Sequence, residues 1–395
     1  MIDNKVIIWA SDDFNSLGLL RILGENNIDL FFLIKGRIGY AAKSKYCVNY
    51  KETHTYQEGY NFLMSTYQDE KYKPIIITSG DGISVFIDQH KDELEKLFII
   101  PGTAKKGVLE KYTDKNIMTK LAIELGIPCP KSIYCQWNSN IDNVNFPCLI
   151  KPSHQKPGHY NEFKFKICNT KSELRNTLNF VRQDSEFILQ DYIKKEKDLL
   201  IYGARLWNGE TIFAGTLIKD RLAFCGSGSH GVLISNTPTC IDKIKMSAFL
   251  EKIDYHGLFS FEYGLVKDKA YFFEVNLRND GTSHYFYQAG ANIPLAYIYS
   301  CAGIDYSHIN TKVDGEHWYI DELFDYENVI TGKISKKQYK IDKRKATVYK
   351  YYDKNDIAPW QYMKSIRLRK MIQDIVLKRF RLYIVFVLDK LGLRK

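Results

Sequence analysis

Residues 259–278 constrain the fold more than any other part of the chain, because two strand-like runs flank the polar segment 267–269. This pattern predicts a β-hairpin with a three-residue turn centred on Asp268. Residues at equal distances from that centre then face each other, with Cβ atoms about 4.5–5.5 Å apart. The expected pairs are Val266 with Ala270, Gly264 with Phe272, and Glu262 with Glu274.

The second strand of this hairpin has one polar face. Its alternation places Tyr271, Phe273, Val275 and Leu277 on one side and Glu274, Asn276 and Arg278 on the other. Opposed carboxylates destabilise a sheet unless a cation lies between them or one is protonated. Carboxylate and amide oxygens suit Mg²⁺ or Mn²⁺, and a guanidinium suits phosphate oxygens. The alternative is a hairpin whose polar face simply contacts water.

Length and composition limit the remaining possibilities. A chain of 395 residues predicts two or three domains, and its 45% hydrophobic content excludes global disorder. Its eight cysteines form no Cys-x-x-Cys pair, which favours reduced thiols in a reducing, cytoplasmic compartment. We see neither a signal peptide at the start nor a run of about 18 apolar residues.

The first hundred residues alternate apolar runs with helix-like stretches. Such runs occur at residues 5–9, 30–34 and 74–78, and alternation of this kind indicates a parallel sheet with crossover helices. We therefore predict an N-terminal Rossmann-like domain over 1–103. No Gly-x-Gly-x-x-Gly follows its first strand, so no dinucleotide is assigned. Residues 104–310 predict a mixed α+β domain.

Several short motifs lie in this second domain in a particular order. Asp114-Lys115 opens a predicted helix, and Gly126-Ile127-Pro128-x-Pro130 follows it. Leu149-Ile150-Lys151-Pro152 and Ile188-Leu189-Gln190-Asp191-Tyr192-Ile193 read as strands. Together with the hairpin, this ordered set resembles the ATP-grasp superfamily. The resemblance covers roughly residues 104–303 and implies an ATP-grasp fold behind the Rossmann-like domain.

The resemblance implies ATP and Mg²⁺ (or Mn²⁺), and it implies roles for particular residues. Lys115 and Lys151 would neutralise phosphates, and Arg278 would lie near the transferred phosphate. The adenine hinge would comprise Gln190, Asp191 and Ile193, with Glu196 or Asp198 on the ribose. Glu262, Glu274 and Asn276 would hold the metal. The alternatives are that Lys151 is only a surface lysine at the end of a strand, and that the hinge is an ordinary edge strand. The usual glycine-rich loop is replaced by 153–161, which contains only Gly158, so Lys156, Lys164 or Lys166 is an alternative source of charge.

The segment Asp280-Gly281-Thr282-Ser283-His284 resembles the version found in carboxylate–amine ligases such as the D-aspartate ligases. The resemblance implies that these residues line an acceptor pocket. A helix N-cap at Thr282 or Ser283 is the alternative. Arg205 and the segment 224–231 are candidates for recognising a carboxylate. The implied reaction forms an acyl phosphate and ADP, after which an amine displaces phosphate, and positioning and charge stabilisation suffice for it.

The positive charge lies at the C-terminal end. Residues 333–395 contain 19 Lys and Arg against 5 Asp, so the chain's net charge of +10 leaves the rest slightly acidic. We predict a basic extension over 311–395, with a helix over 366–391 that lies on anionic lipid, on the body or on the second subunit of a homodimer. Peripheral membrane contact would favour a lipid-linked cell-envelope precursor as substrate. No nucleic-acid reader motif is present. Competing functions are an ATP-grasp carboxylase and a catalytically altered nucleotide-binding module that acts as a membrane-associated assembly subunit.

Overall fold

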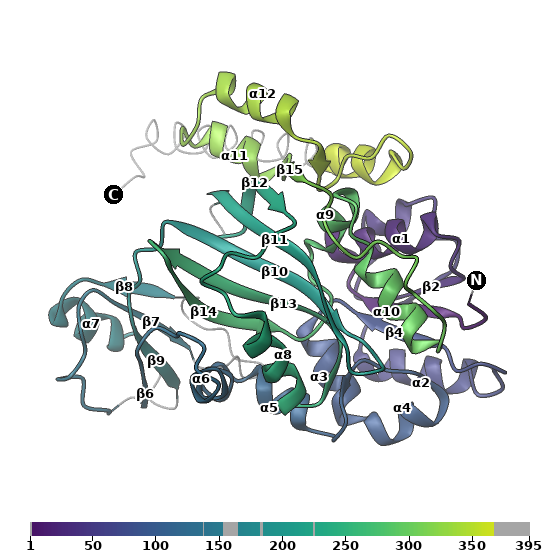
Figure 1. Cartoon of the computed structure of the whole chain (residues 1–395), viewed down its shortest axis with the longest axis horizontal. Coiled ribbons are helices and arrows are strands. Elements are labelled where there is room, and N and C mark those ends of the chain that lie inside the picture. The colour runs from purple at the N-terminus through teal and green to yellow at the C-terminus, as the bar shows by residue number, and fades with distance from the viewer. Residues whose placement is uncertain (1, 137, 153–164, 182–184, 224–225, 367–395) are drawn as a thin grey trace, which may run out of the picture.

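The computed structural model describes residues 2–136, 138–152, 165–181, 185–223 and 226–366. The chain begins with a parallel sheet of order β3-β2-β1-β4, shown in purple and blue in Figure 1. Three of its strands, β1, β2 and β4, are apolar runs that are mostly buried, as parallel sheets require, whereas the edge strand β3 is polar and largely exposed. The strands are β1 (Val6–Ala10), β2 (Leu30–Lys35), β3 (Tyr50–Thr53) and β4 (Ile75–Thr78), and the helices are α1 (Phe14–Glu25), α2 (Tyr56–Thr66), α3 (Asp81–Gln89) and α4 (Lys91–Leu97). This is the predicted Rossmann-like arrangement.

A small antiparallel sheet of order β6-β9-β7-β8 follows, and it projects from the rest of the molecule (Figure 1). Two helices, α5 (Val108–Thr113) and α6 (Lys115–Glu124), lead into it, and Asp114 caps α6 through the amides of Asn116 and Ile117. The strands are β6 (Ser132–Gln136), β7 (Cys148–Pro152), β8 (Lys166–Cys168) and β9 (Glu186–Asp191), with α7 (Lys171–Leu178) packed on β8.

The large sheet has the order β14-β13-β10-β11-β12-β15-β16 and forms the centre of the molecule. Helix α8 (Lys243–Lys252) covers one face, while α9 (Ser283–Gln288) and α10 (Ile293–Cys301) lie on the other between the sheet and α1. Its strands are β10 (Lys197–Arg205), β11 (Thr211–Leu222), β12 (Gly228–Ile234), β13 (Tyr255–Val266), β14 (Lys269–Asn276), β15 (Glu316–Ile320) and β16 (Val348–Tyr349), and β5 (Gly102–Thr103) pairs with β13.

The predicted boundary at residue 310 does not separate two bodies. Strand β15 pairs with β12, and β16 pairs with β15, so part of the expected C-terminal extension completes the large sheet. Helices α11 (Phe324–Ile330) and α12 (Lys336–Lys345) lie between these two strands in sequence. The correction arises because apolar residues such as Tyr319 and Val348, which are buried in the core, are dispersed among the many lysines that dominate the composition.

Residues 350–356 fasten the C-terminal segment to the first domain. The Nε atom of Arg21 donates to the carboxylate of Asp356 at 2.9 Å, and both side chains are almost fully buried. The same carboxylate accepts hydrogen bonds from the Ser44 hydroxyl at 2.8 Å and from the Lys45 amide at 2.9 Å. The charge of Arg21 is therefore compensated by a segment more than 300 residues away in sequence.

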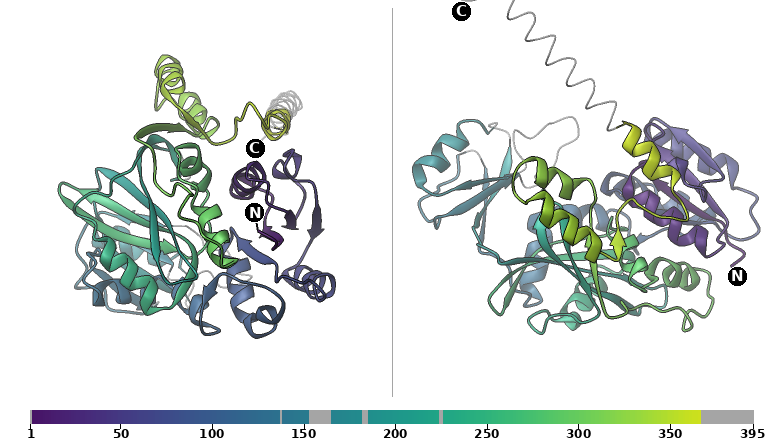
Figure 2. Two further views of the ribbon diagram at one scale, coloured as in Figure 1. Left: turned by 45° about the vertical axis from the view of Figure 1, so that its right-hand side comes forward. Right: turned by 90° about the horizontal axis from the view of Figure 1, so that it is seen from above.

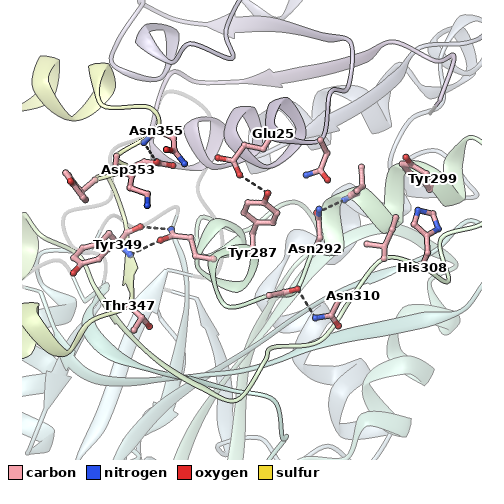
Figure 3. A pocket seen from close by; sticks show the side chains of 17 residues that line it. Glu25, Tyr287, Asn292, Tyr299, His308, Asn310, Thr347, Tyr349, Asp353 and Asn355 are labelled. Atoms are coloured by element: carbon pink, nitrogen blue, oxygen red, sulfur yellow. Dashed lines mark hydrogen bonds between the residues drawn. The ribbon is translucent and has the colours of Figure 1, made fainter.

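A cavity of about 820 Å³ lies beside this fastening, where α1, α9, α10 and residues 347–355 meet (Figure 3). Its polar walls largely bond to one another. The Tyr287 hydroxyl donates to Glu25 at 2.7 Å, and the Gln288 side chain both donates to and accepts from the backbone of Tyr349. These contacts hold the first domain, the large sheet and the C-terminal segment together. Within the described ranges, every helix is too short or too polar to cross a membrane.

We expect Asp356→Ala to lower the free energy of unfolding by about 3–5 kcal/mol, because the buried guanidinium of Arg21 loses its carboxylate. Chemical denaturation followed by circular dichroism would measure this loss. Asp353→Ala is the matched control, since that carboxylate lies 3.9 Å from Arg21 and is more exposed; it should cost less than about 1 kcal/mol. Equal losses for the two variants would contradict this account of the ion pair.

Candidate active site

The hairpin brings Glu262 of β13 directly opposite Glu274 of β14, as predicted. The turn, however, contains two residues instead of the predicted three. Val266 pairs with Lys269 and Gly264 with Tyr271, so the strands start one residue out of the expected register. Lys267 adopts a positive φ of 52°, which a tight two-residue hairpin turn requires.

A β-bulge restores the register before the glutamates. The pairing shifts between Glu262 and Tyr263, so that one extra residue of β14, Phe273, lies opposite this step. The predicted faces are therefore wrong on the turn side of the bulge. Ala270 and Phe272, instead of Tyr271 and Phe273, lie in the core with Val275 and Leu277. The polar face at Glu274 and Asn276 is unaffected, because the bulge lies on the turn side of both.

A lysine compensates each of the paired glutamates. The Nζ atom of Lys219, on β11, lies 3.1 Å from Glu262, and that of Lys115, at the start of α6, lies 2.9 Å from Glu274. Burial raises the pKa of Glu262; Lys219 lowers this pKa, while Glu274 and Asp280 raise it. Lys219 was not predicted. Its one sequence signal is that a lysine follows the apolar run 212–218. In the structure this run belongs to a central strand, where Lys219 pairs with Asp198 of β10.

A chain of hydrogen bonds continues from the glutamates toward the first domain. Asn276 donates to the Ser260 hydroxyl at 3.1 Å, and Ser260 donates to Asp280 at 2.9 Å. Arg278 donates to Asn276 at 3.3 Å and to Asp81, at the start of α3, at 2.6 Å. Asp81 was not among the predicted site residues. Its position after a strand of the parallel sheet is the signal that identifies it.

The predicted phosphate and adenine residues lie where the two antiparallel sheets meet. Lys151 on β7 donates to the Gln190 side chain on β9 at 3.4 Å, and Lys115 lies close enough for its charge to lower the pKa of Lys151. The pKa of Lys151 is lowered to about 8, mainly by burial and also by the charge of Lys115, while Glu274 opposes the shift. At pH 7 Lys151 is therefore still mostly protonated, and it lies in the field of both Lys115 and Glu274.

The predicted hinge connects the small sheet to the large one. Asp191 ends β9 and accepts hydrogen bonds from Asn145 at 3.3 Å, while the exposed Glu196 donates its backbone amide to Leu265. The Ile193 carbonyl accepts from Lys195 within the link. Asp198 lies on β10, where Lys195 contacts its carboxylate. A link of only five residues, 192–196, therefore joins the small sheet to the large one.

The predicted acceptor residues form a contact between domains. A Cβ on Gly281 would lie 2.0 Å from the Phe14 ring of α1, so this glycine permits close packing. The Thr282 hydroxyl donates to Asp280 at 2.6 Å, and the structure gives Thr282 no side-chain cap of α9. Ser283 accepts from Asn279 at 3.0 Å. His284 packs against Gly18, and burial lowers its pKa to about 3, so the ring is neutral at pH 7.

The structure does not bring Arg205 to this site. It lies at the other end of β10, opposite Gly257, and donates to the Gly209 carbonyl at 2.9 Å. In the candidate segment 224–231, residues 224 and 225 lie outside the described ranges, and Ser229 donates to Asp325 at 2.9 Å. Residues 153–164, with Lys156, Gly158 and Lys164, also lie outside these ranges. Lys166 pairs with Ile150 in the small sheet.

Asn279 is the buried residue that joins the site to the first domain, and it was not predicted. Its backbone amide donates to the Thr78 carbonyl at 3.1 Å, and its side-chain oxygen accepts from the Tyr202 hydroxyl at 2.8 Å. Its side chain also bonds to Asn15, at the start of α1. An asparagine between Arg278 and Asp280 gave no distinct signal, because its partners are remote in sequence.

The chemistry of this side-chain set fits a hard divalent cation. Two cross-strand carboxylates and an amide oxygen are hard donors, and their present counter-ions are lysines that approach from other elements. Among the described residues there is no group of three or more His, Cys, Asp and Glu side chains that could hold a metal. A bound ion would therefore rely on Asn276 and on ligand oxygens as well as the two glutamates.

Comparison with known proteins agrees with the fold. No family model matches the chain. It is 26% identical over 246 residues to a D-aspartate ligase of Enterococcus faecium (strain Aus0004), a match that covers 58% of each protein. Two solved structures superimpose on most of the chain. These are the N5-carboxyaminoimidazole synthetase of Staphylococcus aureus complexed with ADP (TM-score 0.63, 14% identity, 84% of this chain and 87% of that one) and the L-amino acid ligase of Bacillus licheniformis (TM-score 0.62, 11% identity, 80% and 79%). The chain therefore has an ATP-grasp fold, which it shares with these solved structures, and part of its sequence is similar to a D-aspartate ligase.

Proposed function

We propose that this protein is an ATP-dependent ligase that joins a carboxylate to an amine and releases ADP and phosphate. The observation that carries the proposal is the pair Glu262 and Glu274, held face to face beside Arg278 where two sheets meet. The partial similarity to a D-aspartate ligase supports the same reaction class. The ADP in a structural neighbour supports nucleotide use.

The metal would be Mg²⁺ or Mn²⁺, held by Glu262, Glu274 and Asn276. When bound, such an ion supplies charge that offsets the phosphate oxygens during transfer. Lys115, now paired with Glu274 at 2.9 Å, is then available for phosphate, as is Lys151. The hinge residues Gln190, Asp191 and Ile193 would hold adenine, and Glu196 or Asp198 would hold ribose.

Arg278 is placed to stabilise the charge that develops when a carboxylate oxygen attacks the terminal phosphorus. Asp81 holds its Nε atom, and Asn276 accepts from a second nitrogen, so the guanidinium is oriented without movement during reaction. The acyl phosphate then loses phosphate as the amine attacks the acyl carbon.

The acceptor would bind at the carboxyl ends of β1 and β4. The order β3-β2-β1-β4 makes this the point where the sheet's connections diverge, the usual place for a ligand in such sheets. Asp13 follows β1 and would attract an ammonium group, while Arg278, held by Asp81 after β4, would attract a carboxylate. Both charges together suit an amino acid. Thr282 and Ser283 line the same loop, whereas His284 and Gly281 support the packing behind it.

A cell-envelope precursor, small or lipid-linked, fits the partial likeness to a D-aspartate ligase, and a cytoplasmic protein at the inner face of a membrane would meet it there. The helix predicted over 366–391 lies, apart from its first residue, outside the described ranges. A homodimer remains a proposal of the same kind.

Glu274→Ala should reduce ADP release by at least about 10²-fold, because the site loses one of its two carboxylates while the strand pairing is retained. A coupled ADP assay with Mg²⁺-ATP and a panel of amino acids and envelope precursors would measure this. Asp268→Ala, in the turn of the same hairpin, is the matched control and should keep its rate. Wild-type turnover in Glu274→Ala would refute the metal role.

The affinity for ADP should fall as pH rises above about 8, because Lys151 then loses its proton before binding and must regain it. The fall should approach tenfold per pH unit until the pKa of the bound state is reached. Calorimetry between pH 7 and 9.5 would show it. Lys151→Arg should bind with little pH dependence, since a guanidinium stays charged. A flat profile for the unmodified protein would remove Lys151 from the phosphate site.

A further inference from the structure

The most concentrated charge in the chain lies on the surface of α12. Residues 333–345 contain seven lysines and arginines and a single acid, Asp342, a net charge of +6 out of +10 for the whole protein. Helix α12 (Lys336–Lys345) forms a hairpin with α11 (Phe324–Ile330) at one end of the large sheet. In the right-hand view of Figure 2 this yellow-green hairpin lies between the small sheet and the first domain.

The inner face of α12 uses the only acid of this segment. Asp342 is buried and accepts a hydrogen bond from Arg221 at 2.9 Å, and Arg221 also donates to Asp325 of α11 at 2.7 and 2.8 Å. Tyr339 and Ala346 pack beside Ile320 of β15. The orientation of the helix is therefore fixed, and no carboxylate of the segment 333–345 remains on its outer face.

The outer face gathers five cations. At roughly 100° per residue they fall within an arc of about 120°, and all five side chains are exposed. Among the described residues, none of them lies within 4 Å of a carboxylate. The five are Lys336, Lys337, Lys340, Lys343 and Arg344.

This arrangement is unfavourable for an unoccupied helix. Lys336, Lys340 and Arg344 follow one another at intervals of four residues, where like charges destabilise a helix. Lys336 and Lys337 also stand in the first turn, which contains no acid, and so oppose the helix dipole. An anionic partner would relieve both effects.

We propose that the outer face of α12 docks on an anionic lipid surface. Apolar side chains beside the cations favour lipid over nucleic acid: Ile341, 48% exposed, borders the cationic arc next to Lys337, and Ile330, 72% exposed, ends α11. The arc itself carries no aromatic side chain on which a base would stack. This surface uses no residue of the segment 366–391 and none of the ligase site, so the proposal is argued without either.

Co-sedimentation of the full-length protein with phosphatidylcholine vesicles, with and without phosphatidylglycerol, tests the proposal. The protein should pellet only with the anionic vesicles and should be released at high salt. Replacing all five cations of the arc by glutamine should lower the partition coefficient at least about tenfold. Its thermal midpoint should stay equal or rise, since repulsion is removed. Its ADP release in solution should be unchanged.

The matched control removes the same number of exposed positive charges elsewhere and should pellet like the unmodified protein. Ile341→Ser, which keeps every charge, should weaken binding to vesicles and leave any binding to a single-stranded RNA unchanged. Undiminished vesicle binding by the glutamine variant would overturn the proposal, and so would binding to RNA in place of vesicles. The control replaces Lys51, Lys71, Lys96, Lys105 and Lys252 by glutamine.

Discussion

The structure depends on the neutralisation of two glutamates that a hairpin forces together. Glu262 and Glu274 are cross-strand neighbours, a placement that is unfavourable for two carboxylates. Their compensation comes from two further elements: Lys219 from β11 and Lys115 from α6. The two ion pairs therefore connect β13 to β11, across β10, and β14 to the helix that leads into the small sheet. In the proposed reaction, a divalent cation would take over this compensation and leave the lysines to the phosphates.

The hairpin shows what a sequence pattern determines and what it leaves open. Two departures from the predicted geometry, a shorter turn and a bulge at Phe273, cancel before the glutamates are reached. A one-residue slip without the bulge would have turned Glu274 toward the core. The pairing could be predicted because burial on one face specifies the register, whereas the turn and the bulge depend on local backbone geometry that alternation alone does not encode.

Contacts between remote segments could not be predicted in the same way. The elements around the site were recognisable from apolar runs and caps, such as Asp114 before α6. Yet Arg278 is oriented by Asp81, 197 residues away, and Asn279 is held by Asn15, 264 residues away. Arg205, chosen for its charge, lies at the wrong end of its strand. A local pattern predicts on which side of its strand or helix a residue lies. The packing of the domains decides which other element that side contacts.

The basic C-terminal part combines two roles that its composition alone does not separate. Lys350 and Asp356 point inward, to Asp321 and Arg21, and complete the core, whereas the cations of α12 point outward. Strand β11 joins these regions, since it carries both Lys219, at the glutamate pair, and Arg221, beneath α12. Because Arg221 holds α11 and α12 through two buried aspartates, a surface that engaged α12 would also fix the orientation of the strand that supplies Lys219. Docking at this face would therefore also set the orientation of the glutamate pair relative to that surface.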